Sequence, residues 1–226
     1  MTRRVAVAML APAGWTPPGV DPFAWRTALA EDAVDLLATL AGVDAAVAVA
    51  AADRDLAEAV VWPGMAILEL PALTVGATLA ALDGYDQAVL CAADAPDLPA
   101  MLLGKLFRPL GSHPVAVSPA EPGPGLLGLA TRLPPPGWLP DAFDSTDPAV
   151  PHAPSGSTVP AVPHAPSGST DPAVPDAPTA LDVLAGRSAD VQVVPGWRRQ
   201  RGPADLAALD PGLEGWEATR RLLLGG

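Results

Sequence analysis

The stretch that most constrains the fold runs over residues 83–99 and reads DGYDQAVLCAADAPDLP. Its central part, 88–93, has the length of one strand and contains no charged residue, which is typical of a strand buried on both faces. The segment that follows Pro99 carries apolar residues at helical spacing and predicts a helix to about Leu110. Asp94 therefore lies at the carboxyl end of a buried strand, which is the edge where ligands bind in open α/β sheets.

The two carboxylates of this stretch have different explanations. Asp97 sits where the N-cap of the following helix belongs, with Pro99 in the first turn, so both a capping role and a binding role are open. Asp94 has no such local role, because a carboxylate at the end of a buried strand is costly unless something pairs with it. Asp94 is therefore a candidate metal or substrate ligand.

The rest of the chain alternates between strand-like and helical segments. Further strands are expected at 4–11, 45–51, 65–70, 114–118 and 191–194, and helices at 23–40, 53–60, 73–82, 99–110, 181–184, 203–209 and 216–224. Since the strands are apolar throughout and are separated by helices, they predict an α/β fold with a mostly parallel sheet covered on both faces.

Two segments rich in glycine and proline follow predicted strands. The first is the loop 11–22, and the second, 119–131, reads PAEPGPGLLGLAT. We expect the second to be a tight loop in which the backbone can approach a ligand closely, although a plain turn would have the same composition. Its glycine spacing matches neither the G-x-G-x-x-G fingerprint nor a P-loop.

A repeat interrupts this pattern. A unit of twelve residues is written about three times between 145 and 180, beginning with STDPAVPHAPSG. Its proline density and low apolar content predict an exposed, disordered insert in a surface loop of a single domain that spans 1–226. His152 and His164 lie in register in the repeats, and the repetition explains their spacing better than a metal site does. The insert is also a candidate segment for meeting a protein partner.

Composition excludes some classes of function. The net charge of −12 argues against nucleic acid as a partner, because no basic stripe offsets the phosphates. No uncharged apolar run reaches the roughly 18 residues of a membrane span, and the single cysteine, Cys91, sits inside a predicted strand. We expect a cytoplasmic protein. An acidic protein that handles a phosphorylated ligand usually needs a divalent cation to bridge the charges.

Several motifs together resemble one bacterial family. CAADAPDLP followed by an apolar helix, a strand that ends in SPAE, the run GLLGL and the tail motif GPADL at 202–206 are similar to nucleotide-diphospho-sugar transferases of glycosyltransferase-A type. Some members of that family are glycosyltransferases of arsenosugar biosynthesis. The turn Asp-x-Pro after the strand is shared with molybdenum-cofactor and phospholactate guanylyltransferases.

The resemblance implies a Rossmann-like, three-layer α/β/α fold that binds a nucleotide sugar or a nucleoside triphosphate at the carboxyl edge of its sheet. It implies that Asp94 is the catalytic residue that holds Mg²⁺ or Mn²⁺ against the diphosphate of the donor. The other residues expected to bind the nucleotide lie around the same edge: Ala11, Pro12, Gly14, Asp97, Glu121, Gly123 and Gly125.

The sequence also departs from the family. Its first loop, 11–22, contains neither Lys nor Arg to grip phosphate, and 122–125 reads PGPG where the family has Asp-Gly-Gly and an aromatic residue. Arg199 and Arg201 stand where the family offers two aspartates. Two classes of function therefore stay open. The chain is a sugar or nucleotidyl transferase, or it is a catalytically degenerate relative kept as a binding or scaffold module.

Overall fold

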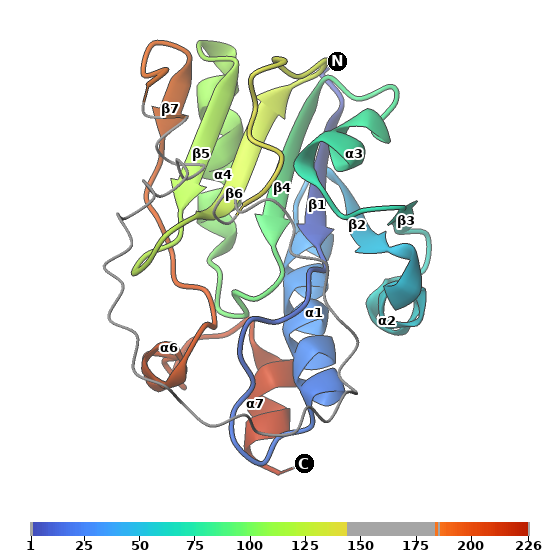
Figure 1. The fold of residues 1–226 in the computed structure, drawn as a ribbon, viewed down its shortest axis with the longest axis vertical. Helices are drawn as coiled ribbons and strands as arrows, with labels where there is room; N and C mark the ends of the chain where they lie inside the picture. Colours follow the sequence, from blue (N-terminus) through green and yellow to red (C-terminus); the bar gives the residue numbers. More distant parts are fainter. Residues whose placement is uncertain (1, 144–183, 185, 226) are drawn as a thin grey trace, which may run out of the picture.

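The central layer of the molecule is one sheet of seven strands in the computed structural model, which describes residues 2–143, 184 and 186–225. The strands are β1 (Arg4–Met9), β2 (Asp44–Ala50), β3 (Ala66–Leu70), β4 (Gln87–Ala92), β5 (Val115–Pro119), β6 (Leu126–Arg132) and β7 (Val191–Val193). They lie side by side in the order β3-β2-β1-β4-β6-β5-β7 (Figure 1). All neighbouring pairs are parallel except those of β6, which runs antiparallel to β4 and β5. The predicted mostly parallel sheet is confirmed.

Helices cover both faces of this sheet. The helices of the described residues are α1 (Pro22–Ala38), α2 (Arg54–Val60), α3 (Val75–Ala80), α4 (Ala100–Phe107), α6 (Pro203–Ala207) and α7 (Glu217–Leu223), with 3₁₀ turns at Ala51–Asp53 and Arg108–Gly111. Side chains of α1, α2 and α4 pack on one face, and α3 packs on the other together with segments between 133 and 143. The expected three-layer α/β/α arrangement is therefore confirmed. The helix expected at 181–184 falls almost entirely outside the described residues, as does the repeat at 145–180.

Strand β6 corrects one sequence prediction, because its residues were expected to belong to a loop. The tight turn is confined to residues 119–125, where Gly123 and Gly125 have φ angles of +117° and +88° that favour glycine. Gly128 lies inside β6 because a Cβ there would come 2.9 Å from a methyl carbon of Leu106 and 3.3 Å from the carbonyl oxygen of Leu90. This glycine marks a close approach of α4 and β4 to the strand.

The two helix starts that the sequence suggested differ in their capping. Asp21 caps α1, since its carboxylate accepts a hydrogen bond of 2.8 Å from the backbone N–H of Ala24. The N-cap of α4 is Pro99, which makes no side-chain cap, so of the two roles that the sequence left open for Asp97, the capping role is wrong. The carboxylate of Asp97 is instead engaged by residues near the end of the chain.

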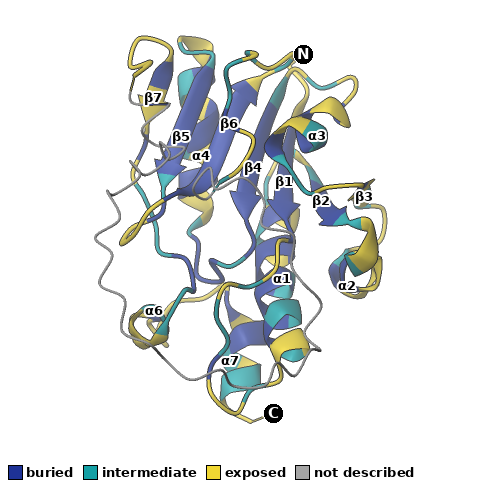
Figure 2. Cartoon of the chain, viewed as in Figure 1, coloured by how far each residue is buried: buried dark blue, intermediate teal, exposed yellow. Residues whose placement is uncertain are grey.

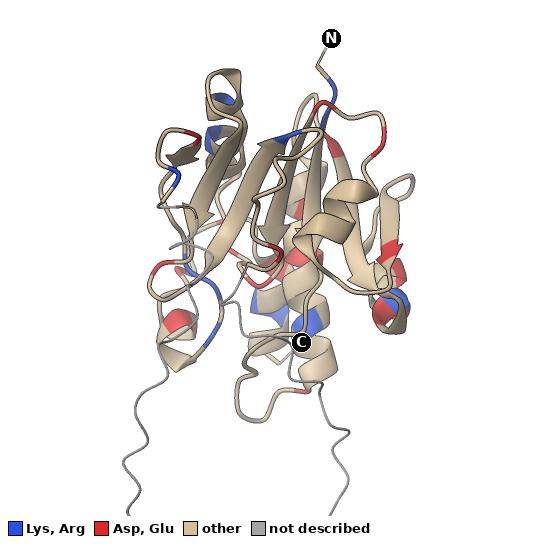
Figure 3. Cartoon of the chain, turned by 45° about the horizontal axis from the view of Figure 1, so that its top comes forward, with Lys and Arg blue, Asp and Glu red and all other residues tan. Residues whose placement is uncertain are grey.

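The inner strands of the sheet are the most buried, and the edge strands β3 and β7 are more exposed. Figure 2 shows most of β1, β4, β5 and β6 in the colour of buried residues, and Figure 3 shows few charged residues in these strands. Cys91 is fully buried in β4, and this burial raises the pKa of its thiol to about 12. The prediction that Cys91 sits inside a strand is confirmed.

The last helix is held by a buried carboxylate of the first. Asp32 on α1 accepts hydrogen bonds from the backbone N–H groups of Ala218 (2.8 Å) and Thr219 (2.9 Å) in the first turn of α7. Only 1% of Asp32 is exposed, and this burial raises its pKa to about 6 against the opposing effect of these hydrogen bonds. Asp32 thus caps α7 from a distant part of the chain.

The chain returns to the same sheet after the repeat. Strand β7 pairs in parallel with β5, from Val115 beside Val191 to Val117 beside Val193. A single domain interrupted at about 145–180 stays a prediction, because the interrupting residues lie outside the described part. None of the described helices has the length and apolar character needed to span a bilayer.

Candidate functional site

The topology of the sheet marks one place at its carboxyl edge. From β1 the chain moves outward through β2 to β3, and β4 then pairs with β1 on its other side. The connections after β1 and β4 therefore diverge and leave a crevice between the carboxyl ends of these two strands. Such a switch point is where open α/β sheets bind their ligands.

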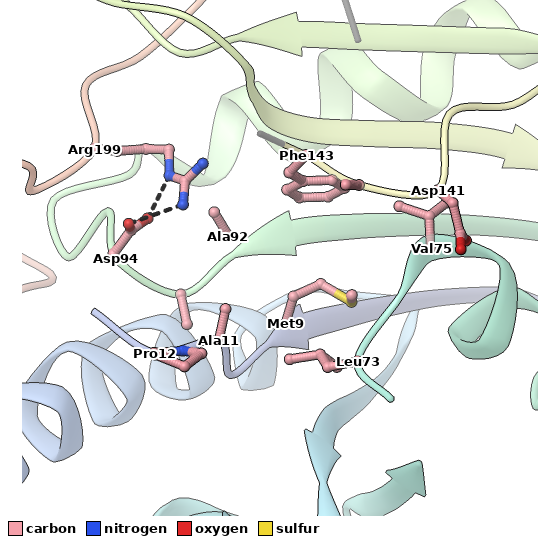
Figure 4. Close-up of a pocket in the computed structure, with 12 residues that line it drawn as sticks. Met9, Ala11, Pro12, Leu73, Val75, Ala92, Asp94, Asp141, Phe143 and Arg199 are labelled. Atoms are coloured by element: carbon pink, nitrogen blue, oxygen red, sulfur yellow. Dashed lines mark hydrogen bonds and ion pairs between the residues drawn. The ribbon is translucent and has the colours of Figure 1, made fainter. Parts of the chain in front are cut away.

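A pocket of about 180 Å³ opens at this switch point. Figure 4 shows the ring of Phe143 across the pocket from Met9 and Leu73, with the charged side chains of Asp94 and Arg199 at one end. Most of its lining is apolar, and the full set of lining residues is Met9, Ala11, Pro12, Leu73, Val75, Ala92, Ala93, Asp94, Asp141, Ala142, Phe143 and Arg199. An apolar pocket with a few converging polar groups is typical of a site for a small organic ligand.

Asp94 and Arg199 form a two-pronged ion pair at the end of the pocket. The Nε and Nη2 atoms of Arg199 donate to the two carboxylate oxygens of Asp94 at 2.7 and 3.0 Å (Figure 4). Arg199 also donates from Nη1 to the carbonyl oxygen of Leu126 at 3.2 Å. The exposed fractions of the two side chains are 12% for Asp94 and 7% for Arg199, so solvent screens the pair only weakly. The partner that a strand-end carboxylate requires is therefore an arginine of this chain.

The segment that carries Arg199, residues 197–201, crosses the carboxyl end of β4, and we call it the arginine segment. Its backbone is tied to β4 because the N–H of Gln200 donates to the carbonyl oxygen of Asp94 at 2.7 Å. Trp197 and Arg198 donate to the two carboxylate oxygens of Asp97 at 3.1 and 2.5 Å. The two acids that follow β4 thus each pair with an arginine of this segment.

Close packing before the arginine segment fixes its path. A Cβ on Gly196 would lie 2.6 Å from the carbonyl oxygen of Pro119, so only glycine lets the chain pass so near the end of β5. Immediately afterwards, Trp197 forms an isolated parallel bridge with Ala120. These contacts with the end of β5 place Arg199 at the edge of the sheet where β4 ends.

The structure brings some of the predicted site residues together and separates others. Asp94, Ala11 and Pro12 line the pocket. The remaining predicted residues are not among the residues that line it: Gly14, Asp97, Glu121, Gly123 and Gly125. The glycine turn instead contacts the arginine segment, since Nη1 of Arg201 donates to the carbonyl oxygen of Pro124 at 2.5 Å.

The loop 11–22 contains no cation, but an arginine of the next helix supports its start. Arg26 on α1 donates from Nη2 to the carbonyl oxygen of Leu10 at 2.6 Å and from Nε to that of Ala11 at 3.2 Å. The same guanidinium forms two hydrogen bonds of 2.8 Å with Asp53, and these bonds lower the pKa of the Asp53 carboxyl. Arg26 therefore fixes the backbone at the mouth of the pocket.

The described acids at this edge do not form a preassembled cluster of metal ligands. Both oxygens of Asp94 are engaged by Arg199, and Asp97 is engaged by Trp197 and Arg198. The exposed carboxylate of Asp141 accepts a hydrogen bond of 2.6 Å from the backbone N–H of Gly76. In the described part of the chain, no three His, Cys, Asp or Glu side chains gather closely enough to hold a metal ion.

Sequence reasoning missed several residues of the pocket. Leu73 and Val75 follow β3, and the rule that ligands bind at carboxyl edges could have found them. Asp141 and Phe143 carry no comparable local signal. Arg199 was noted as a departure from a family pattern but was not predicted to pair with Asp94, although a buried acid without a local partner called for a cation elsewhere in the chain.

Comparisons with known proteins agree with the architecture. A protein from Desulfovibrio desulfuricans G20 that has been proposed to be a nucleotide-diphospho-sugar transferase matches at a TM-score of 0.58 and 17% identity, over 98% of this chain and 95% of that one. The 4-diphosphocytidyl-2C-methyl-D-erythritol synthase of Anaerococcus prevotii DSM 20548 matches at 0.53 and 11%, over 98% and 96% of the two chains.

No protein-family model matches the sequence, and no curated protein sequence is significantly similar to it. The likeness is therefore one of structure at low sequence identity. Together with the seven-stranded sheet and the switch-point pocket, it shows that this chain has the fold of the nucleotide-diphospho-sugar transferases.

Proposed function

We propose that the chain is a transferase that takes a nucleotide-activated donor, a nucleotide sugar or a nucleoside triphosphate, at the switch-point pocket. The observation that carries this proposal is the position of the pocket, which is lined by the residues that follow β1 and β4. In sheets of this topology a nucleotide lies across that crevice.

The character of the lining supports a nucleotide. Phe143, Met9 and Leu73 offer apolar surface to a flat, aromatic base, and stacking of a base on an aromatic ring stabilises binding by about 1–3 kcal/mol. The volume of about 180 Å³ is below the roughly 300–1,000 Å³ of pockets that enclose a whole ligand of drug size. The pocket would therefore enclose part of the nucleotide, and the remainder would lie along the open edge.

A transfer reaction would also require positive charge at the carboxyl edge of the sheet. When a nucleotide-activated donor reacts, negative charge develops on its departing diphosphate or pyrophosphate, and fixed positive groups stabilise that charge. Two cationic side chains at the carboxyl end of β4 are those of Arg198 and Arg199, which pair with Asp97 and Asp94. Arginine suits this task because its planar guanidinium matches phosphate oxygens.

A second candidate function is a binding module without catalysis. The observation that favours it is the engagement of Asp94 by Arg199, which leaves this strand-end carboxylate neutralised within the pocket. Such a protein would bind a nucleotide or nucleotide sugar and release it unchanged.

The two candidates differ in turnover. Thermal shift and calorimetric titration with nucleoside triphosphates and nucleotide sugars, each with and without Mn²⁺, should reveal a ligand, because a ligand of the native state raises its melting temperature. Cleavage of the bound donor, followed by chromatography of the nucleotide product, supports the transferase. Binding without cleavage supports the module, and no binding under any condition contradicts both.

A pair of variants tests the location. Ala11→Trp places a large side chain at the mouth of the pocket, on an exposed position whose own side chain is small. It should weaken binding by at least about tenfold. Ala208→Trp, on an exposed position after α6, makes the same change away from the pocket and should leave binding unaltered. Equal effects of the two variants would place the ligand elsewhere.

A further inference from the structure

We propose that this site works without a divalent cation, because the guanidinium of Arg199 occupies the place beside Asp94 that a cation would take. The lack of a metal site is inferred from the contacts of the described residues alone. The claim that nucleotide binding is independent of metal rests in addition on the proposed function. The sequence predicted a divalent cation at this site, whereas the contacts of Asp94 disfavour one.

The first step is the state of Asp94. A carboxylate binds Mg²⁺ or Mn²⁺ through its oxygen lone pairs, and both oxygens of Asp94 already accept hydrogen bonds from Arg199 at 2.7 and 3.0 Å. The bonds are charge-assisted and two-pronged, which is the strong form of this interaction. Each oxygen keeps a further lone pair, but a cation bound there would lie beside the positive guanidinium of Arg199, which repels it and is nearly buried at an exposed fraction of 7%.

The second step is the lack of supporting ligands. Mg²⁺ demands near-octahedral oxygen coordination, usually from one or two carboxylates together with phosphates and water. The next acid along the chain, Asp97, is engaged by Trp197 and Arg198, and its side chain is fully buried. Among the described residues no cluster of three potential metal ligands exists. The other carboxylate that lines the pocket, Asp141, lies at the opposite end from Asp94 (Figure 4), so it does not stand beside Asp94 to share a cation.

The third step is the anchoring of Arg199. Its backbone neighbour Gln200 is bonded to the carbonyl oxygen of Asp94, and its own Nη1 atom donates to the carbonyl oxygen of Leu126. The preceding residue, Arg198, is held by Asp97. Because these contacts fix the segment on both sides of Arg199, the guanidinium is part of the folded framework and is not a loose side chain that a cation would push aside.

The metal itself provides the first test. In the wild-type protein labelled with ¹⁵N, Mn²⁺ should broaden the backbone amide signals of Ala95 and Gln200 no more than those of exposed acidic surface residues. These amides lie next to Asp94 in sequence and by hydrogen bonding. Selective broadening of both signals at low Mn²⁺ concentration would overturn the proposal, and this measurement requires no variant.

An engineered site gives the converse result. Arg199→Asp removes the competing guanidinium and sets a second carboxylate beside Asp94, so its affinity for Mn²⁺, measured from the electron paramagnetic resonance signal of free Mn²⁺, should exceed that of the wild type by at least about tenfold. Arg221→Asp, on an exposed position of α7, makes the same change in charge and should leave the affinity near that of the wild type. A wild-type protein that already binds Mn²⁺ as tightly as Arg199→Asp would contradict the proposal.

Nucleotide binding provides the last test. Titrations with the four ribonucleoside triphosphates and with UDP-glucose should give dissociation constants in EDTA that agree within about twofold with those in Mn²⁺. An affinity at least about tenfold higher in Mn²⁺ would overturn the inference while supporting the proposed function. If none of these compounds binds under either condition, the proposed function fails, and the Mn²⁺ measurements on the protein alone still decide whether a metal site exists.

Discussion

Asp94 and Arg199 are nearly buried charges that depend on each other. Desolvation of such a pair offsets much of its Coulombic attraction, so the pair as a whole adds little to the free energy of unfolding. Removal of one member has a different result, because the remaining charge stays desolvated without its partner. Loss of one member of the pair should therefore change the free energy of unfolding more than the intact pair contributes to it.

This asymmetry predicts the effect of Asp94→Asn. The neutral amide leaves Arg199 without its counter-charge at an exposed fraction of 7%, so the free energy of unfolding should fall by about 3 kcal/mol. The double variant Asp94→Asn, Arg199→Met should recover most of that loss, since it removes both charges. Urea denaturation of the wild type, both single variants and the double variant measures the coupling. Unchanged stability in Asp94→Asn would mean that the ion pair does not hold in solution.

The sequence could state the need of Asp94 for a partner but could not identify the partner. The acid follows a buried strand, which is a local signal, whereas Arg199 lies 105 positions further along the chain. The same separation explains why the sequence left the role of Asp97 open, since its local context also fits a helix cap. Its partners, Trp197 and Arg198, follow β7, whose pairing with β5 brings this part of the chain to the sheet. Contacts of this range are set by topology, which local patterns do not report.

At the scale of elements, the docking of α7 on α1 depends on a carboxylate with a raised pKa. The folded state raises the pKa of Asp32 from 3.8 to about 6, so the native protein binds a proton more tightly than the unfolded chain does. Tighter proton binding by native Asp32 adds to the free energy of unfolding. This addition is complete below about pH 4 and is lost as the pH rises through about 6.

A comparison with Asp32→Asn isolates this contribution from the other carboxylates. The free energy of unfolding of the wild type minus that of the variant should be greater at pH 4 than at pH 7, by up to about 3 kcal/mol. The difference should change mainly between pH 4 and pH 6. Urea denaturation across this range measures it, and a difference that stays constant or grows with pH would show that the pKa of Asp32 is not raised.

Elements whose apolar residues follow a single local pattern could be predicted from the sequence, whereas β6 could not. Buried strands such as β1 and β4 are nearly continuous apolar runs, and α1 shows helical spacing, so their positions follow from the sequence. Strand β6 contains Gly128 and follows the turn at 119–125, and glycine with proline indicates a loop. The reason for Gly128 is the space taken by Leu106 and by the backbone at Leu90, which only the packed structure contains.

At the scale of the whole molecule, Cys91 reports on opening of the sheet. It is the only cysteine, it lies in β4 between β1 and β6, and burial raises the pKa of its thiol to about 12. Because the thiolate is the reactive form, native protein at pH 8 should react with an aromatic disulfide reagent at least about 100-fold more slowly than protein unfolded in urea. A Cys91→Ala, Ala208→Cys variant, with its thiol on an exposed position, should react rapidly when native. Fast reaction of native Cys91 would mean that the centre of the sheet opens locally.

The described chain on either side of the repeat belongs to the same body. Phe143 and Leu184 both pack in the cluster on the α3 face of the sheet, and β7 then pairs with β5. The described residues alone supply a seven-stranded sheet, two hydrophobic clusters and the Asp94–Arg199 pair. The sequence predicted that the repeat contributes no core, since proline is frequent and apolar residues are few.

These points predict that the repeat can be removed without loss of the fold. Replacement of residues 145–179 by a short linker of glycine and serine should preserve a single cooperative thermal transition, with a midpoint within about 5 °C of the wild type, because the entropy of loop closure changes only slowly with length. A variant with the repeat scrambled at constant composition should melt at the same temperature. Calorimetry measures both. A broad transition or a large fall in the midpoint for the deletion alone would show that the repeat's composition contributes to the fold. The same loss in both variants would show that its order does, and in either case the prediction of one domain with a dispensable insert would be wrong.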